Sequence, residues 1–420
     1  MTPSAAALVK VKADSPRYIG RMTTPVHQMH PSTTHRRGLG NIANNCYLNS
    51  AFQALRHVRP FADLFRSTDW STYSRSDKRG HSLAHNTSAL MKAIWSPDVD
   101  PQGRRTVLPS QFVRSFVEYA QACGIDEIRF GAQADASEAL QLLVDGLHTH
   151  ISREVHMRVT GSPTEPARIE YKQSVESWAT FFHKEYSKIL DIFYGQTQAR
   201  LTCTKCSHSS TSYTPWGSLK VEIPGATTPG APAPPLKDCI SSAFSKELLD
   251  GYRCDNCKEA GTTEKTHCIS KFPPYMILVI KRFTASMQKV RARIPYDEAD
   301  VDFSDYITWP TIQKTTAAHY RVVSTIEHLG GTRGGHYIMR ARDDYAEGVD
   351  PEWLIYDDGN VTKSPIGGAA TPDTYVLILE RHEKGPSIMQ PTPSREDPSE
   401  TKEGVTESKE TNETAVTNAK

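Results

Sequence analysis

Cys46 is the residue whose surroundings point most clearly to chemistry. It lies between a loop rich in glycine and asparagine, residues 38–45, and an apolar pattern typical of a helix. At a helix N-terminus the backbone N–H groups and the helix dipole favour a thiolate, so we expect the pKa of this thiol to be lowered. The same N–H groups, joined by the Asn41 amide, would stabilise an oxyanion. The alternative is a buried structural cysteine.

A cysteine nucleophile needs a base, and His336 is the candidate. It lies between a glycine-dense turn, residues 330–335, and an apolar run that predicts a strand. The glycines indicate a mobile loop gated by substrate. Asp357 ends another expected strand and is suited to hold one imidazole nitrogen so that the other faces the thiol. Asp358 is a substitute for this role, and an ordinary Asp-Gly turn is the alternative for both carboxylates.

Four further cysteines form two Cys-x-x-Cys pairs, Cys203 with Cys206 and Cys254 with Cys257. Four thiolates at this spacing predict one tetrahedral Zn²⁺ per chain, and such a closed site would be structural. The alternatives are two unrelated reduced pairs or a thioredoxin-like redox motif, which lacks its βαβ context here. The remaining cysteines are weaker candidates: Cys268 with His267 as substitute ligands, and Cys123 and Cys239 as core residues.

The elements that must position these residues fall into two groups. Helical patterns come first, over residues 46–64, 108–123 and 136–148. Alternating or β-branched runs then predict strands over residues 192–194, 219–223, 275–280, 320–326, 337–342 and 375–379. This order predicts an α+β architecture in which a helical lobe packs on a mainly antiparallel lobe. Five prolines and two glycines in residues 224–235 indicate a stiff exposed insert.

The two ends of the chain differ from its centre in composition. Residues 1–37 carry six basic residues against one acid and are rich in Ser, Thr, Pro and His. This composition predicts a disordered arm, with a mitochondrial transit segment as the alternative. Residues 383–420 contain no aromatic residue and repeat Glu, Thr, Ser and Lys, which predicts a solvated tail.

Composition also narrows the class of protein. The 420 residues include 49 basic and 48 acidic side chains, and this net charge of +1 argues against nucleic acid or an anionic membrane as the main partner. No apolar run approaches the ~18 residues of a membrane span. Eight cysteines are too few for a disulfide framework, and half of them form Cys-x-x-Cys pairs. We therefore expect a reducing compartment, the cytoplasm or the nucleus.

The order Cys, His, Asp is that of papain-like proteases, and the surrounding motifs resemble those of one family, the ubiquitin-specific proteases. The family's cysteine box reads Gly-Leu-x-Asn-x-Gly-Asn-Thr-Cys-Tyr-x-Asn-Ser, and residues 38–50 match it except at Ala43 and Asn45. Residues 133–138 match the box Gln-Gln-Asp-Ala-x-Glu with its second Gln lost, and residues 281–283 form the Lys-Arg-Phe marker. The histidine box is matched by His328, Gly330, Gly335, His336, Tyr337, Trp353, Tyr356, Asp357 and Asp358.

The resemblance covers residues 38–382 and implies a papain-like cysteine protease fold. That fold has a helical thumb, an antiparallel β palm and zinc-tipped β fingers, the last over about residues 192–283. The implied activity is that of a deubiquitinase, which hydrolyses the isopeptide or peptide bond after the C-terminal glycine of ubiquitin. Cys46 would be the nucleophile, His336 the base, Asp357 its orienting partner and Asn41 an oxyanion donor. We expect a monomer that binds ubiquitin and ubiquitinated proteins.

The resemblance also implies a substrate-binding set. Asp135 and Glu138 would face the two arginines of the ubiquitin tail, because carboxylates pair well with guanidinium groups. Gln133 and Tyr337 belong to the same set. Asp135 and Glu138 are also spaced as a helix capping box, a role that can coexist with recognition.

Two departures from the family pattern leave other functions open. Ala43 would cost about 1 kcal/mol relative to glycine if its φ were positive, whereas Asn45 can make a short polar contact as the family's Thr does. Ala43 and the lost Gln leave room for a catalytically silent ubiquitin-binding scaffold. A zinc-ribbon nucleic-acid module is a third class, which the net charge disfavours.

Overall fold

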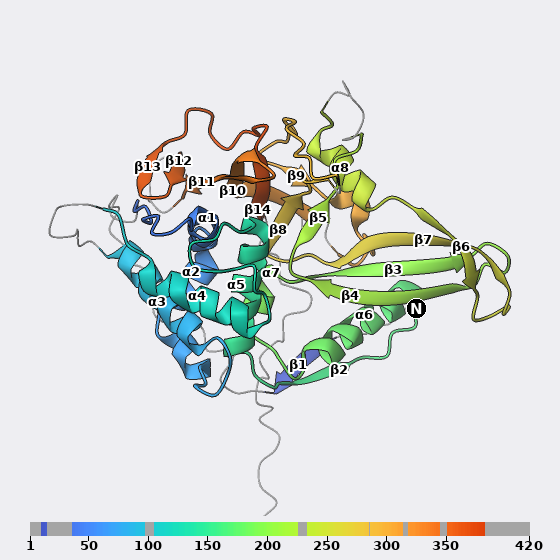
Figure 1. Ribbon diagram of the computed structural model, residues 1–420. Helices are drawn as coiled ribbons and strands as arrows, with labels where there is room; N and C mark the ends of the chain where they lie inside the picture. The colour runs from blue at the N-terminus through green and yellow to red at the C-terminus, as the bar shows by residue number, and fades with distance from the viewer. Residues whose placement is uncertain are drawn as a thin grey trace, which may run out of the picture.

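The computed structural model describes residues 10–14, 36–96, 105–225, 233–284, 286–313, 318–344 and 351–382. Helices come first and strands follow, and Figure 1 shows the first helices gathered in one lobe beside the main sheet. This lobe contains α1 (Cys46–Arg56), α2 (Arg59–Arg66), α3 (His81–Trp95), α4 (Ser110–Ala122) and α5 (Ala136–Ile151). Later in the chain lie α6 (Pro166–Phe182), α7 (Lys188–Phe193) and α8 (Leu236–Ala243).

The main sheet places the predicted histidine and aspartate on neighbouring strands. Its strand order is β13-β12-β11-β10-β14-β8-β5, and β9 pairs with β10 outside this path. All of these pairs are antiparallel except β5 with β8. The bounds are β5 (Leu219–Val221), β8 (Tyr275–Ile280), β9 (Val301–Asp302), β10 (His319–Gly331), β11 (Gly334–Asp343), β12 (Glu352–Asp357), β13 (Asn360–Lys363) and β14 (Thr374–Arg381).

The centre of the main sheet, formed by β8, β10 and β14, is buried on both faces, which explains its continuous apolar runs. In β8, Ile277 and Val279 pack into the core shared with the helical lobe. Met276 and Leu278 pack on the opposite face, in the core that includes α8. Successive side chains of a strand point to opposite faces, so a strand covered on both sides is apolar throughout.

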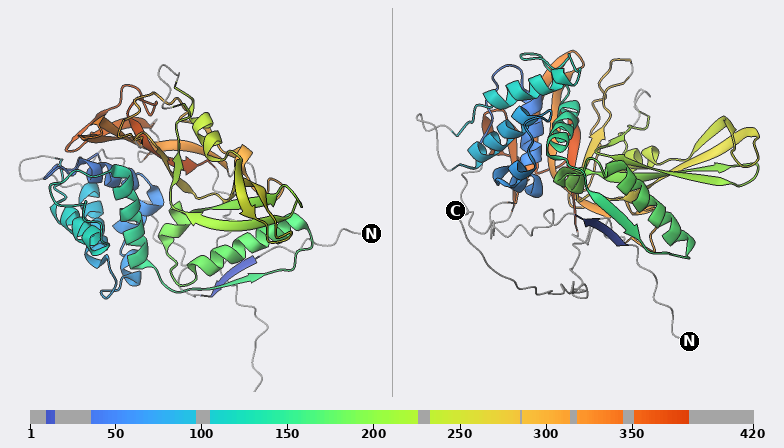
Figure 2. Two further views of the ribbon diagram at one scale, coloured as in Figure 1. Left: turned by 45° about the vertical axis from the view of Figure 1, so that its right-hand side comes forward. Right: turned by 90° about the horizontal axis from the view of Figure 1, so that it is seen from below.

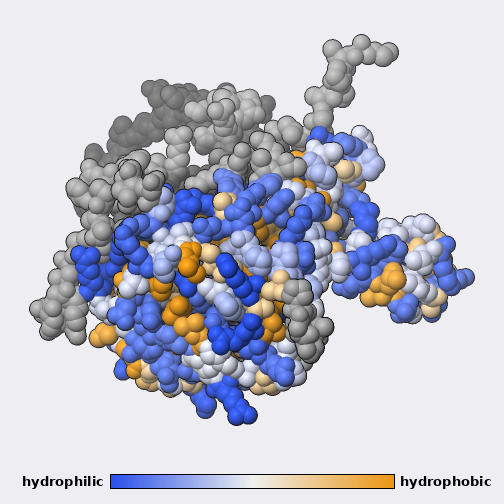
Figure 3. All heavy atoms as spheres, turned by 90° about the horizontal axis from the view of Figure 1, so that it is seen from above, coloured by the Kyte–Doolittle hydropathy of each residue, from blue (hydrophilic) through white to orange (hydrophobic). Residues whose placement is uncertain are grey.

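A second sheet projects from the body as an arm. Its strands, in the order β4-β3-β7-β6, are β3 (Gly195–Cys203), β4 (Ser209–Trp216), β6 (Glu247–Arg253) and β7 (Ala260–Lys271). Figures 1 and 2 show the arm extending away from the helical lobe with α6 beside it, and Figure 3 shows its far end as a mostly hydrophilic knob. Most β6 side chains are exposed, so this sheet has little core of its own. We call it the finger sheet.

The structure confirms most predicted elements and corrects two. Helices over residues 108–123 and 136–148 and strands over residues 275–280, 320–326, 337–342 and 375–379 are present, and the strand predicted over residues 219–223 is the shorter β5. The helix predicted over residues 46–64 is divided at His57 and Val58 into α1 and α2. The strand predicted over residues 192–194 is wrong, because Ile192 and Phe193 end helix α7. Periodicity alone cannot assign so short an apolar run.

The ends of the chain also bear on the predicted domains. Lys10–Asp14 form β1, which pairs antiparallel with β2 (His156–Thr160), as Figure 2 shows. This strand differs from the disorder predicted for residues 1–37. The rest of that arm up to residue 35, residues 226–232 of the insert and the tail from residue 383 lie outside the described residues. Within the described chain, no helix has the length and apolar character that crossing a membrane requires.

Candidate active site

Cys46 is the first residue of α1, and the loop before it is shaped by asparagine side chains. The buried Asn45 side chain accepts hydrogen bonds from the N–H groups of Ile42 and Ala43 at 2.7 and 3.2 Å. The residue in the left-handed region is Asn44, with φ of 55°, and not Ala43. Asparagine tolerates that conformation better than most residues. Alanine in place of the family's glycine therefore adds no strain here.

The thiol of Cys46 is buried, with 3% of the residue exposed. Burial raises its pKa, and the negative charge of Asp358 raises it further, while backbone N–H groups such as that of Tyr337 act in the opposite direction. The predicted lowering of this pKa is therefore wrong for the free chain, because desolvation outweighs the helix N-terminus. Within the described residues, no hydrogen bond joins the thiol to His336.

His336 and Asp357 form the predicted pair. The imidazole lies on β11 and the carboxylate ends the neighbouring strand β12, with 2.6 Å between Nε2 and Oδ1. With Nε2 held by the carboxylate, Nδ1 is the nitrogen left to exchange a proton with a thiol. Asp357 is thus placed for the orienting role predicted for it. His336 lies within a strand of the β10–β11 hairpin, so the glycine-dense segment is a tight hairpin instead of the mobile loop that we predicted.

Asp358 connects the cysteine loop to the turn after β12. Its Oδ1 accepts a hydrogen bond from the Asn49 amide at 2.7 Å, and its Oδ2 accepts one from the Asn41 amide at 2.9 Å. The Asp358 carbonyl also accepts from the N–H of Leu39 at 2.8 Å. In the free chain, the Asn41 amide is therefore directed at Asp358. The carboxylates of Asp357 and Asp358 lie close to the His336 ring, but only that of Asp357 is bonded to it.

Gln133 and Tyr337 hold the hairpin against the helical lobe. The Gln133 amide donates to the Gly335 carbonyl at 3.0 Å, and its oxygen accepts from the Gly335 N–H at 3.3 Å. Tyr337 is buried. Direct contact of either residue with ubiquitin stays a prediction.

Asp135 and Glu138 have different surroundings. Asp135 is the N-cap of α5, where its Oδ1 accepts from the N–H groups of Ser137 and Glu138 at 2.8 and 3.1 Å. Its Oδ2 accepts from the Tyr375 hydroxyl at 2.8 Å. The capping alternative is thus confirmed for Asp135. Glu138 is exposed, and its carboxylate has no hydrogen bond or ion pair with another described residue, so it is the more available partner for a cation.

This difference gives a prediction. Glu138→Lys should raise KM for ubiquitin substrates about 30-fold, because a carboxylate–guanidinium contact contributes on the order of 2 kcal/mol, with little change in Tm. Asp135→Ala should lower Tm by about 1–2 °C, because losing an N-cap costs about 1 kcal/mol and the domain is large. Glu118→Lys, an exposed change on α4, is the control. Ubiquitin whose tail arginines are changed to acids should partly restore the KM of Glu138→Lys. If it does not, Glu138 does not bind the tail arginines.

The four predicted metal ligands meet at the tip of the finger sheet. The Sγ atoms of Cys203 and Cys257 lie 4.0 Å apart and those of Cys206 and Cys254 lie 3.6 Å apart, and all four fall within 4.8 Å of one another. Tetrahedral Zn–S bonds of about 2.3 Å would place the sulfur atoms about 3.8 Å apart, so the set fits such an ion. Cys268 lies along β7, paired with Gln198, and takes no part in this cluster.

The two Cys-x-x-Cys pairs adopt matching turns. The N–H of Ser207 donates to the Cys203 carbonyl and that of Lys258 donates to the Cys254 carbonyl, both at 2.9 Å. Ser207 and Lys258 have φ of 57° and 59°. Each turn thus folds its two sulfur atoms to one side, and the finger strands bring the two turns together.

A cysteine at a helix N-terminus, beside a histidine–aspartate pair on an antiparallel sheet, defines the class of papain-like cysteine proteases. The chain belongs to the ubiquitin carboxyl-terminal hydrolase family, whose profile matches residues 37–379. The resemblance to ubiquitin-specific proteases is thereby confirmed.

Relatives and solved structures agree with this assignment. The chain is 28% identical over 383 residues to ubiquitin carboxyl-terminal hydrolase 2 of Bos taurus, covering 89% of this chain and 58% of the relative. It is 26% identical over 381 residues to ubiquitin carboxyl-terminal hydrolase 21 of Homo sapiens, covering 84% and 62%. It thus spans less than two thirds of either relative. The SAGA Ubp8/Sgf11/Sus1/Sgf73 DUB module bound to ubiquitin aldehyde contains a chain of the same fold, with a TM-score of 0.63 at 18% identity, covering 84% of this chain and 72% of that one.

Sequence reasoning missed several residues that shape the site. Asn49 lies within the cysteine box, so its motif position was a usable signal for its contact with Asp358. Tyr375, which bonds Asp135, lies in a run that reads only as a strand. Lys289 and Asp373 lie outside every motif that we examined.

Proposed function

We propose that this chain is a deubiquitinase that hydrolyses the isopeptide or peptide bond after the C-terminal glycine of ubiquitin. The observation that carries the proposal is the His336–Asp357 pair at 2.6 Å in the site where Cys46 begins α1. Membership of the family and the ubiquitin aldehyde bound to the similar DUB module support ubiquitin as the substrate.

The residues of the site account for both halves of the reaction. As the Cys46 sulfur bonds to the substrate carbonyl carbon, His336 accepts the thiol proton and then gives it to the leaving amine. Water attacks the thioester with His336 again as base, which releases the ubiquitin carboxylate and restores the thiol. The N–H groups that face the thiol would bind the oxyanion, and the Asn41 amide would join them by leaving Asp358.

Binding of the ubiquitin body supplies the energy that aligns its tail. The finger sheet and the helical lobe offer the contacts, and Glu138 offers a carboxylate for the tail arginines. We infer that one chain acts as a monomer on one ubiquitin, without nucleic acid or membrane. All eight cysteines are free, which supports a reducing location such as the cytoplasm or the nucleus.

A silent ubiquitin-binding scaffold is the second candidate. The raised pKa of Cys46 and the lack of a bond from its thiol to His336 favour it. Apo active sites are often loosely aligned and tighten when substrate binds, so these features do not exclude catalysis.

Hydrolysis of ubiquitin with a fluorogenic C-terminal amide separates the two candidates. We expect saturable release of the fluorophore with kcat/KM of at least about 10⁴ M⁻¹s⁻¹. The same fluorophore on a peptide of the ubiquitin tail alone should be released far more slowly, because the body of ubiquitin is then missing. Binding of ubiquitin without any turnover would support the scaffold instead.

We further propose that the four finger cysteines hold one structural Zn²⁺. Coordination by four thiolates would leave no open position on the ion, so zinc would supply no reactive water and would only join the two turns. Neither outer strand of the finger sheet, β4 or β6, has a buried side chain, so this link would contribute much of the sheet's stability.

Removal of one ligand tests the zinc proposal. Cys254→Ser should lower the zinc content from one per chain to nearly none, weaken binding of ubiquitin and expose residues 200–260 to proteases. Alkylation of Cys46 by a small reagent should be unchanged. Cys268→Ser, in the same sheet but outside the cluster, is the matched control. Freshly purified protein that contains no zinc by elemental analysis, with all four thiols titratable, would overturn the proposal.

A further inference from the structure

Strand β10 runs beyond the end of its neighbour β14. The pairing of β10 with β14 ends at Glu327 and Thr374, whereas β10 continues to Gly331 against β11 alone. One edge of this extension therefore faces no strand. Of this extension only His328 is buried, whereas residues 329–331 are exposed. The buried backbone groups of His328 still need partners, because unpaired buried polar groups are costly. Across the hairpin, Leu329 of the extension is paired with His336.

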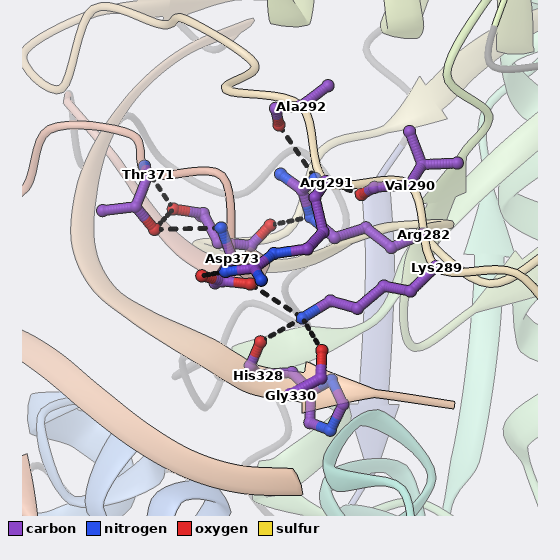
Figure 4. Close-up of polar contacts among 10 residues, drawn as sticks. Arg282, Lys289, Val290, Arg291, Ala292, His328, Gly330, Thr371 and Asp373 are labelled. Atoms are coloured by element: carbon purple, nitrogen blue, oxygen red, sulfur yellow. Dashed lines mark hydrogen bonds and ion pairs between the residues drawn. The ribbon is translucent and has the colours of Figure 1, made fainter. Parts of the chain in front are cut away.

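Lys289 and Asp373 occupy the position where another strand would lie. The His328 N–H donates to the Asp373 carbonyl at 3.0 Å. The Lys289 ammonium donates to the carbonyls of His328 and Gly330, the latter at 3.2 Å, and so holds the residues on both sides of Leu329. Figure 4 shows the lysine side chain reaching these two carbonyls and the Asp373 carboxylate.

The ion pair that fixes this lysine is buried. Lys289 Nζ lies 2.8 Å from Asp373 Oδ1, and their side chains are only 3% and 9% exposed. Although burial alone would raise it, the pKa of Asp373 is lowered by Lys289 and by Arg291, whose exposed guanidinium lies 3.0 Å from the carboxylate. The buried Arg282 bonds the carbonyls of Val290, Ala292 and Thr374, which holds both chain segments in place.

The hairpin itself needs external support. Gly330 has φ of 118°, and a Cβ on Gly335 would lie 2.3 Å from the Leu329 carbonyl oxygen, so glycine is required at both positions. Glycine also leaves the backbone of this segment more freedom than other residues would. Gln133 holds Gly335 from the helical lobe, and Lys289 holds the other strand of the hairpin.

We propose that the buried Lys289–Asp373 pair positions His336 for proton transfer by fixing the β10 strand against which His336 is paired. The proposal rests on the proposed deubiquitinase function. Lys289 is a positioning residue, since it acts through the hairpin backbone and touches no reacting atom. Its loss should misplace the imidazole while leaving the ubiquitin-binding surfaces intact.

The test compares Lys289→Met and Asp373→Asn with Lys289→Arg. Arg321→Met is the control, because Arg321 forms an ion pair with Glu380 between β10 and β14 near the other end of the sheet. We expect Lys289→Met to lower kcat about 10- to 100-fold with KM changed less than about threefold, and Lys289→Arg to recover much of the loss. Hydrogen exchange of residues 326–338 should quicken in Lys289→Met and Asp373→Asn but not in Arg321→Met.

Normal kcat in a folded Lys289→Met chain, or an equal loss of kcat in Arg321→Met, would overturn the proposal. Unchanged hydrogen exchange of the hairpin in both Lys289→Met and Asp373→Asn would overturn it as well. The exchange measurement needs no substrate. If the natural chain does not cleave ubiquitin at all, the proposed function fails, and exchange still decides whether the pair fixes the hairpin.

Discussion

Replacement of Cys46 with alanine is expected to lower the rate of ubiquitin hydrolysis by about 10⁴-fold or more, to the background of the assay. The change removes only the sulfur atom, whose hydrogen-bond partners are backbone N–H groups such as that of Tyr337, so α1 should stay folded. Affinity for ubiquitin should stay within about threefold, because the finger sheet and the helical lobe are unchanged. Hydrolysis of the fluorogenic amide and direct binding of ubiquitin measure the two effects.

The control for this change is Cys123→Ala. Cys123 is the C-cap of α4 and its thiol contacts Arg79, which belongs to none of the site motifs, so its loss should leave kcat unaltered. The reactivity of Cys46 adds a pH dependence. Because burial raises its pKa, alkylation of the free chain should be slow at pH 7 and should quicken as the pH rises toward that pKa. Normal turnover by the Cys46→Ala chain would show that Cys46 is not the nucleophile and would refute the proposed cysteine deubiquitinase.

Loss of His336 is the second large effect. His336→Ala should reduce kcat by at least about 1000-fold, because the imidazole serves as base and then as acid in both half-reactions. Residues of one catalytic unit are not additive, so Cys46→Ala combined with His336→Ala should be no worse than either change alone. His328→Ala should be milder, since the His328 ring packs edge-on against Phe283 and at a tilt against Tyr337 and has no bond to Asp357.

Replacement of Asp357 and of Asp358 should lower kcat to different extents. Asp357→Ala should lower kcat less than His336→Ala does, by about 100-fold, because the imidazole remains and the adjacent Asp358 can partly orient it. Asp358→Ala frees the amides of Asn41 and Asn49, so its effect should be smaller again. If Asp358→Ala proves far worse than Asp357→Ala, Asp357 is not the third member of the site.

The candidate catalytic residues could be proposed from sequence because each lies in a local pattern with its own chemistry. Cys46 precedes an apolar helix, His336 follows glycines, and Asp357 ends a strand, and all three patterns depend on short stretches of sequence. The spacing of the four finger cysteines, in two Cys-x-x-Cys pairs, likewise predicts a zinc site. The structure joins His336 to Asp357 and gathers the four finger cysteines as predicted, whereas no hydrogen bond in the described residues joins the Cys46 thiol to His336.

The errors concern properties that tertiary packing decides. The pKa of Cys46 depends on how deeply the helix lies against the sheet, which no local pattern reveals. Ile192 and Phe193 read equally well as strand or helix until the Ser187 cap is considered. Lys289 and Asp373 are 84 residues apart, and each alone is an ordinary charged residue. Their burial follows from where β14 begins, at Thr374, which only the assembled sheet defines.

Ubiquitin whose C-terminal glycine carries an electrophile, such as a vinyl methyl ester, reports directly on the nucleophile. We expect a single covalent adduct with the mass of one ubiquitin, mapped by peptide mass spectrometry to Cys46. Cys46→Ala should abolish this adduct, whereas Cys123→Ala should not. If the chain forms no adduct, or is labelled at one of the finger cysteines instead of Cys46, then Cys46 is not the nucleophile of a deubiquitinase.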